Sequence, residues 1–179
     1  SKLMPLPIVS GIKLAPHWDG ALPQLLSCLD DENAETRRLM CSVMEVALAR
    51  LGSSRISHEQ VRELYPKLLN RLDDSSDQIR LLVCGPLESL LKSIQYSSIY
   101  AADANLDKTN LQYLLRGLLV HLDDPSAEIQ GAVLGVVKHA LQIDPPVCAD
   151  ELRTVRDRHR SPKLCDALLE DVASLGQLV

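Results

Sequence analysis

The sequence predicts an all-α protein, an α-α superhelix of about four helix pairs of which the last is divergent. The first observation is a repeated motif, Leu-Leu-x-x-Leu-Asp-Asp, at residues 25–31, 68–74 and 118–124, in steps of 43 and 50 residues. The second is that each copy lies between two amphipathic segments, so the predicted unit is a helix, a turn with two aspartates and a second helix. Repeats of this length and content are typical of an α-solenoid.

The third observation is the composition of the 179-residue chain, which is 46% hydrophobic but only 3% aromatic and has no phenylalanine. A core of Leu, Val, Ile and Ala suits closely packed helices better than a β-sandwich or barrel, where aromatic and β-branched residues concentrate. The net charge of −5 argues against nucleic acid as a partner, because a phosphate-binding surface needs a basic excess.

Cysteine usage and the lack of long apolar segments predict a cytoplasmic protein. The five cysteines are scattered and include no C-x-x-C pair, which favours reduced, buried thiols over disulfides. No apolar run approaches the roughly 20 residues that span a bilayer. Residues 1–4 have no signal-peptide layout. We therefore expect no membrane partner and no disulfide framework.

Two segments of unequal size are expected, a lead-in over 1–18 and a single solenoid domain over 19–179. The lead-in is interrupted by prolines but is apolar, so we expect it to cover the end of the stack or to be the remnant of a preceding repeat. An extended connection over 95–108 accounts for the longer second step. The helix pairs are predicted at about 19–50, 57–94, 109–142 and 146–176.

Capping residues predict where several helices begin. Asp19 is expected to cap the first helix. Ser57 and Gln60 have the spacing of a capping box, in which the two residues satisfy each other's backbone N–H groups, and so have Thr109 and Gln112.

Prolines predict two further helix starts and one interruption. Asp124-Pro125 and Asp144-Pro145 each have the form of an N-cap followed by a first-turn proline. Pro86 falls inside the second helix of its pair, where it should remove a hydrogen bond and bend the axis.

The paired aspartates of the motif are predicted to be structural. A carboxylate at the start of a helix accepts free backbone N–H groups and faces the positive end of the helix dipole. Arg37 and Arg80, one turn into the second helices, are positioned to pair with aspartates of the neighbouring repeat. A metal or acid–base site is the alternative, but pairs in successive repeats lie about 10 Å apart and do not converge. His121 occupies the motif slot that Cys28 and Arg71 fill elsewhere, which we expect to be exposed and not a metal ligand.

The sequence contains no pattern of catalytic residues. It has no Gly-rich phosphate loop, no G-x-S-x-G, no H-E-x-x-H and no Cys/His zinc spacing. We therefore predict a protein that is not an enzyme, with no catalytic residue, no cofactor, no bound metal and no small-molecule substrate.

The repeated pattern Leu-Leu-x-x-Leu-Asp-Asp-x-x-x-x-(Ile/Thr)-(Arg/Gln) resembles the HEAT repeat over about 19–142. A narrower likeness involves the run 115–126, then residues 159–161, and then Cys165 with the Leu-Leu pair at 168–169. These residues resemble the C-terminal end of the HEAT-repeat dynein axonemal assembly factors, which are much longer than this chain.

This resemblance implies a non-enzymatic, cytoplasmic scaffold that takes part in preassembly of the axonemal dynein arms of motile cilia. It implies protein partners, namely axonemal dynein chains, chaperones or other assembly factors. The stretch over about 143–158 is matched less clearly, so no binding residue is transferred through it. The alternative is a HEAT-repeat adaptor of another cytosolic complex, such as a transport, phosphatase or translation scaffold.

The second helix of each pair is predicted to line the inner face of the superhelix. In the first pair the inward stripe is expected at Thr36, Met40, Val43 and Ala47, so the outward residues of successive second helices form one groove. Its charged members are the predicted partner-binding residues. The outward row consists of Arg38, Ser42, Glu45, Ala49, Leu81, Gly85, Glu88, Lys92, Gly131, Gly135, Lys138 and Gln142.

Three glycines in this row, Gly85, Gly131 and Gly135, are unusual because each costs about 1 kcal/mol relative to Ala inside a helix. Close packing of neighbouring helices is the favoured explanation. Close approach of a partner is the alternative.

A basic run near the C-terminus is the second candidate surface, with Arg153, Arg156 and Arg160 as its predicted partner-binding residues. The favoured interpretation is a solvated face whose cations lie near a helix C-terminus. An acidic partner surface is the alternative. Nucleic acid is disfavoured because no aromatic residues are interleaved for base stacking.

Overall fold

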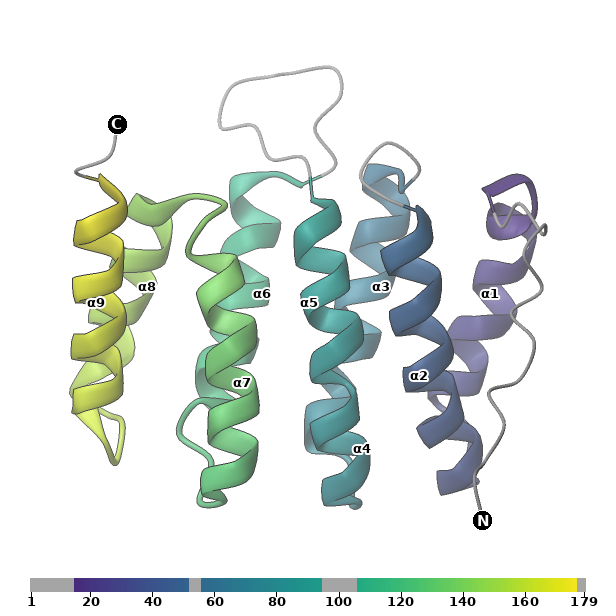
Figure 1. The fold of residues 1–179 in the computed structure, drawn as a ribbon, viewed down its shortest axis with the longest axis horizontal. Helices are drawn as coiled ribbons and strands as arrows, with labels where there is room; N and C mark the ends of the chain where they lie inside the picture. Colours follow the sequence, from purple (N-terminus) through teal and green to yellow (C-terminus); the bar gives the residue numbers. More distant parts are fainter. Residues whose placement is uncertain (1–14, 52–55, 95–105, 177–179) are drawn as a thin grey trace, which may run out of the picture.

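The computed structural model describes residues 15–51, 56–94 and 106–176, and these ranges form helices and turns with no β-strand. The helices stand side by side in two layers (Figure 1). The predicted all-α class is confirmed. Most of the predicted lead-in over 1–18 and of the connection over 95–108 lies outside the described residues.

The first helices of the pairs form the rear layer, and the second helices form the front layer (Figure 1). The rear layer contains α1 (Trp18–Leu29), α3 (His58–Asn70), α6 (Lys108–His121) and α8 (Pro145–Arg156). The front layer contains α2 (Ala34–Leu51), α4 (Asp77–Leu82), α5 (Cys84–Ser93), α7 (Ala127–Ala140) and α9 (Pro162–Gly176). Two 3-10 turns, η1 (Ala15–His17) and η3 (Arg71–Asp73), precede α1 and follow α3.

One continuous apolar core fills the space between the two layers. It begins at Trp18, which is 1% exposed, and continues to Leu168 in α9, with leucines from every rear helix. Each fully buried leucine contributes about 1.5–3 kcal/mol. Within the front layer α2 packs on α5, and α5 packs on α7, so each repeat is held by the next as well as by its own helix pair.

Two helix starts agree with the sequence. Ser57 Oγ accepts a hydrogen bond from the Gln60 backbone N–H (3.2 Å), and Gln60 Oε1 accepts one from the Ser57 N–H (3.0 Å). The capping box is therefore confirmed. Asp144 caps α8 by accepting from the Val147 N–H (3.0 Å), with Pro145 as the first helical residue.

Two predicted caps are wrong. Asp19 does not cap α1, because the helix begins at Trp18 after η1, and Asp19 instead accepts a hydrogen bond from the Gln60 side chain (2.7 Å). Thr109 does not cap α6, because the N-cap is Asp107, whose carboxylate accepts from the backbone N–H one turn in.

The predicted loss of a hydrogen bond at Pro86 is confirmed. The second helix of this pair is divided at Val83 into α4 and α5. Pro86 has no N–H to donate to the carbonyl of Leu82, four residues earlier, so the helical ladder cannot continue unbroken there.

The second aspartate of each motif copy forms the turn before the helix and is not the N-cap. Asp31, Asp74 and Asp124 each accept a hydrogen bond from the backbone N–H two residues later, at 2.8, 3.1 and 2.8 Å. The prediction that Asp124 caps α7 is therefore wrong, since the N-cap is Ser126. An aspartate in such a turn bonds its own backbone just ahead of the helix.

These aspartates also join successive repeats, as predicted. Arg37 of α2 donates two hydrogen bonds to Asp74, at 2.7 and 2.9 Å, and Arg80 of α4 pairs with Asp124. Hydrogen bonds from Arg37 hold the pKa of Asp74 below its usual value. The series ends at Gln130 of α7, which bonds the carbonyl of Leu122 in its own repeat (2.9 Å).

The first aspartate of a copy pairs in the opposite direction, with a basic side chain of the following repeat. Asp30 contacts Arg71 (3.4 Å), and Asp73 contacts His121 (3.6 Å). The prediction that the His121 slot is exposed is wrong, because His121 is 8% exposed. The slot is an inter-repeat contact, so its occupant faces the preceding turn and not solvent.

Candidate protein-binding surface

The front face is the outward surface of α2, α4, α5, α7 and α9, the layer nearest the viewer in Figure 1. None of the twelve residues of the predicted outward row is buried, although Leu81 also packs against the apolar core. The row is therefore accessible to solvent in successive repeats.

The inward stripe predicted for α2 is wrong at Val43, whereas Ala47 is buried as predicted. Val43 was expected to face the core but is 47% exposed, while Arg37 is 9% exposed. The arginine faces inward because Asp74 receives it there. The buried residues of α2 are Arg37, Cys41, Met44, Ala47, Leu48 and Leu51.

At two of the three glycines a glutamate side chain of the neighbouring front helix occupies the space that a Cβ would need. A Cβ at Gly85 would lie 2.6 Å from the carboxylate of Glu45, and one at Gly135 would lie 3.3 Å from a carboxylate oxygen of Glu88. The same contact thus recurs in successive interfaces, with a glutamate of one front helix over a glycine of the next. Gly131 differs, because nothing lies within 4 Å of a Cβ added there, so helix packing does not account for it.

The charged residues of the front face form pairs that remain open to solvent. Glu88 contacts Lys92 (3.4 Å) and His139 of the neighbouring helix (3.4 Å). Lys138 contacts Asp171 (3.3 Å). The side chains of Lys92 and Lys138 are 58% and 54% exposed. Pairs exposed to this degree contribute about 0–1 kcal/mol, so they can be exchanged for a partner's groups at small cost.

Arg38, another charged member of the row, is held within its own helix. Its guanidinium pairs with Glu35 one turn earlier (2.6 Å), and its side chain is 32% exposed. Its charge is therefore less available to a partner than the charges of Lys92 and Lys138.

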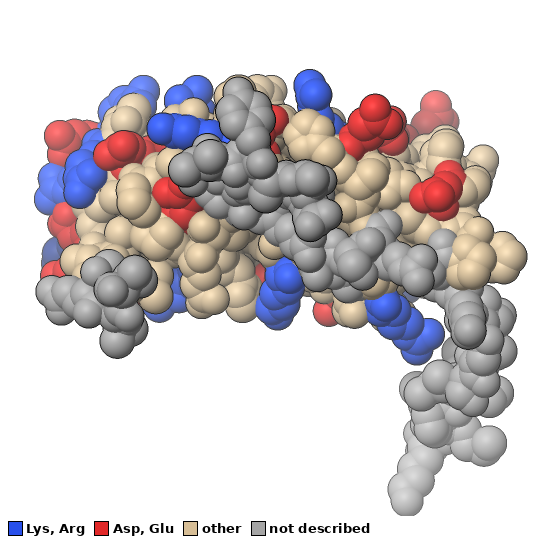
Figure 2. All heavy atoms as spheres, turned by 90° about the horizontal axis from the view of Figure 1, so that it is seen from above, with Lys and Arg blue, Asp and Glu red and all other residues tan. Residues whose placement is uncertain are grey.

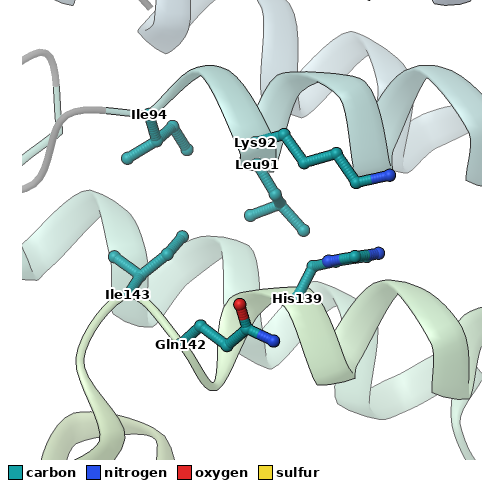
Figure 3. Close-up of a pocket in the computed structure, with 6 residues that line it drawn as sticks. All are labelled: Leu91, Lys92, Ile94, His139, Gln142 and Ile143. Atoms are coloured by element: carbon teal, nitrogen blue, oxygen red, sulfur yellow. The ribbon is translucent and has the colours of Figure 1, made fainter.

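A hollow of about 450 Å³ opens between α5 and α7 on this face. Figure 3 shows Ile94 and Ile143 facing each other at one end of the hollow, with Lys92 and His139 at the other. The hollow thus combines an apolar end with a cationic and hydrogen-bonding end. The sequence analysis missed His139 and the two isoleucines, because it took only one outward position from each helical turn.

Two smaller hollows continue this line. One of about 230 Å³ lies between α2 and α5 and includes Ala49 and Lys92, and one of about 290 Å³ lies between α7 and α9 and includes Lys138 and Gln142. Lys92 and Gln142 each border the central hollow as well. Three hollows in successive inter-helix grooves, joined by shared polar residues, suit an extended or helical protein segment better than one small molecule.

The basic run near the C-terminus is largely neutralised by neighbouring carboxylates. Arg153 pairs with Asp150 (3.0 Å), and Arg156 forms a two-pronged contact with Asp166 (2.5 and 2.9 Å). Arg160 donates its backbone N–H to Asp123 (2.8 Å). Seen from above, blue and red side chains are interspersed around the end that carries α8 and α9 (Figure 2). These residues do not form a uniform basic surface.

A cysteine–histidine contact in the last pair lacks the features of a nucleophile. Cys165 Sγ lies 3.4 Å from His159 Nδ1, but burial raises the pKa of the thiol. A reactive cysteine needs the opposite shift. Within the described ranges, no group of three or more His, Cys, Asp or Glu residues is placed to hold a metal ion.

Comparison with known proteins gives a consistent result. No protein-family model matches the chain. Dynein axonemal assembly factor 5 from Mus musculus is 33% identical over 169 residues, or 94% of the chain, and the Homo sapiens protein is 32% identical over 168 residues. The Xenopus laevis protein is 34% identical over 151 residues, or 84% of the chain. Over most of its length the chain is similar to one region of dynein axonemal assembly factor 5.

The similarity extends over nearly all of this chain but over only a small part of each relative. The chain spans 19% of the length of the mouse dynein axonemal assembly factor 5 and 17% of the frog protein. The predicted resemblance to the dynein axonemal assembly factors is confirmed. None of the described helices is both long and apolar enough to cross a membrane.

Proposed function

We propose that this chain is a non-enzymatic, cytoplasmic HEAT-repeat scaffold that binds proteins during the preassembly of axonemal dynein arms. The observation that carries the proposal is the 32–34% identity to dynein axonemal assembly factor 5 over most of the chain. The partners expected from it are axonemal dynein chains, chaperones or other assembly factors.

The HEAT assignment is supported by the repeated turn and the packing order. Residues 19–179 act as one solenoid domain in this proposal, because the apolar core is continuous from α1 to α9. The inter-repeat pairs Arg37–Asp74 and Arg80–Asp124 recur at equivalent positions, as expected of stacked copies of one unit.

The binding surface in this proposal is the front face. Its charges are exposed and weakly paired, and its three hollows continue across four successive front helices. Binding would therefore depend on many small contacts spread over repeats and not on one deep pocket. The basic run of α8 is a weaker candidate, because its arginines already have acidic partners.

Affinity purification of the tagged chain from ciliated cells, followed by mass spectrometry, tests the function. We expect dynein heavy and intermediate chains to be enriched over a tag-only control. Recovery of nuclear-pore or phosphatase subunits without dynein chains would instead support an adaptor of another cytosolic complex.

A matched pair of single variants tests the surface. Lys138→Glu changes an exposed lysine of the front face, and Lys108→Glu makes the same change at an exposed position in the first turn of α6 in the rear layer. We expect the first to reduce dynein capture several-fold and the second to leave it unchanged. Equal capture by both variants would remove Lys138 from the binding surface.

A further inference from the structure

The three hollows of the front face lie in one row near the C-terminal ends of the front helices. Each hollow lies in the groove between two neighbouring front helices, which stand side by side in Figure 1. Packed helices are about 8–10 Å apart, so successive hollows recur at about that distance. A partner segment that occupies the whole row must therefore present side chains on one of its faces at intervals of about 10 Å.

Each hollow has an aliphatic part that a partner's side chain can fill. Leu48 lines the first hollow, Ile143 lines the second and Leu175 lines the third. Ile143 and Leu175 are half-buried and pack against the apolar core. An aliphatic side chain that enters such a hollow removes apolar surface of both molecules from water, which favours binding.

The charged lining residues give the row a basic character. Among the described residues that line the hollows, the basic ones are Lys92, Lys138 and His139, and the acidic one is Asp171. Both lysine side chains are more than half exposed, and the carboxylates that they contact, Glu88 and Asp171, are partly exposed. Such pairs exchange readily because water screens them. A partner's carboxylates therefore complement the row better than basic side chains do.

The repeat distance favours an α-helix over other partner segments. An α-helix rises 1.5 Å per residue, so every seventh residue returns to the same face after about 10.5 Å. An extended strand covers about 10 Å in three residues, but its third residue points to the opposite face. A polyproline helix also returns after about 9 Å, but such segments bind grooves lined by aromatic side chains. None of the described residues that line the three hollows is aromatic.

We propose that the row of hollows binds an acidic amphipathic helix of a partner protein, which crosses α2, α5, α7 and α9. This helix has an aliphatic residue at every seventh position and a carboxylate about one turn from each of them. Its aliphatic side chains enter the hollows, and its carboxylates pair with Lys92 and Lys138 in exchange for Glu88 and Asp171. Three anchors span about 15 residues. The inference rests on the proposed function, because it specifies the kind of partner segment that the front face binds.

Selection from a random peptide library tests the inference without a known partner. Peptides of about 20 residues, displayed on phage, are selected on the purified 179-residue chain. We expect the enriched sequences to be acidic, with Leu, Ile or Val at heptad spacing and Asp or Glu three or four residues from each. Synthetic copies of them should gain helical circular dichroism when they bind.

A charge exchange tests whether these peptides bind in the hollows. The variant Lys92→Glu with Lys138→Glu should bind them about tenfold or more weakly in fluorescence anisotropy. Copies with Lys in place of Asp and Glu should bind this variant more tightly than they bind the unmodified chain. The matched control is Arg62→Glu with Lys108→Glu, at exposed positions of the rear layer, which should change neither affinity. Thermal midpoints within about 2 °C of the unmodified chain show that both variants are folded.

Four results would overturn the inference. They are enriched peptides that are basic or proline-rich, bound peptides that stay non-helical, acidic peptides that bind the Lys92→Glu, Lys138→Glu variant as well as the unmodified chain, and a selection that yields no specific peptide.

Failure of the inference is distinguishable from failure of the proposed function. The selection uses no dynein, and dynein capture is measured separately with Lys138→Glu and Lys108→Glu. If capture depends on Lys138 but the selected peptides are not acidic helices, the inference is wrong and the proposed function stands. If the acidic helices bind in the hollows but dynein chains are not captured, the proposed role in dynein assembly is wrong.

Discussion

The row of motif turns and the front face both carry paired charges, but they differ in burial. At the turns the carboxylate side chains of Asp74 and Asp124 are 1% and 7% exposed. On the front face the lysines that pair with Glu88 and Asp171 are more than half exposed. Removing one partner of a buried pair costs about 3–5 kcal/mol, whereas an exposed pair contributes about 0–1 kcal/mol. The turns therefore fix how repeats stack, and the front face keeps charges that a partner can use.

The largest effect is expected from Asp74→Ala. This change leaves Arg37 and Arg71 without their buried acceptor, so the free energy of unfolding should fall by about 3–5 kcal/mol. Urea denaturation measures the loss. Asp171→Ala, which removes the front-face partner of Lys138, is the control and should cost less than about 1 kcal/mol. Similar losses from both variants would contradict the difference between the two regions.

Glycine substitutions compare a position where a neighbouring side chain fills the space for a Cβ with a position where that space is open. A Cβ at Gly117 of α6 would lie 2.7 Å from Leu69 of α3, so Gly117→Ala should destabilise the chain by about 1–3 kcal/mol. Gly131 has open space around it, so Gly131→Ala should stabilise by up to about 1 kcal/mol. Both values come from chemical denaturation. A stabilising effect at Gly117 would show that the two rear helices can separate.

The pH dependence of stability tests the burial of His121. Burial lowers the pKa of His121 from its usual 6.5, although attraction from Asp73 opposes the shift, and Arg80 and Asp124 lie nearby. Because the pKa is lower in the folded state, the unfolded state binds more protons as the pH falls below about 6.5, and stability is lost there by at most about 1.4 kcal/mol per pH unit.

Urea midpoints at pH 7.5 and pH 5.5 measure this dependence. His121→Gln should flatten it, because the variant lacks the buried imidazole. An unchanged pH dependence in His121→Gln would mean that the pKa of His121 is the same in the folded and unfolded states, which would contradict the effect of burial.

The smallest effect is expected on the front face itself. Lys92→Ala removes one exposed pair with Glu88, and the free energy of unfolding should change by less than about 0.5 kcal/mol. A loss above 2 kcal/mol would show that the front-face charges are part of the stacking interactions.

Most contacts between repeats were predictable, because the residues that form them recur at fixed positions of the motif. The spacing from each Asp-Asp to Arg37 and Arg80 predicted inter-repeat pairs, and the structure contains both. The position of the aspartates relative to the helix was not predictable in the same way. An aspartate two residues ahead of a serine can serve as the cap or as the turn before it, and composition alone does not separate the two.

The error in α2 has a physical cause. Apolar residues occur on two sides of this helix, at Cys41 and Met44 toward the core and at Val43 and Val46 toward solvent. Arg37 added to the ambiguity, because an arginine is normally expected outside and faces inward only where a buried carboxylate receives it. The hollow around His139 and Ile143 could not be predicted either, since it depends on how far α5 and α7 stand apart.

The measurement that tests the account most directly combines stability with capture in one front-face variant. The variant carries Glu88→Lys, Lys92→Glu and Lys138→Glu, and the matched control carries Glu63→Lys, Arg62→Glu and Lys108→Glu at exposed positions of the rear layer. The account predicts thermal midpoints within about 2 °C of the unmodified chain for both, and at least a tenfold loss of dynein chains from ciliated-cell lysate for the front-face variant alone. Full dynein capture by the folded front-face variant would contradict it.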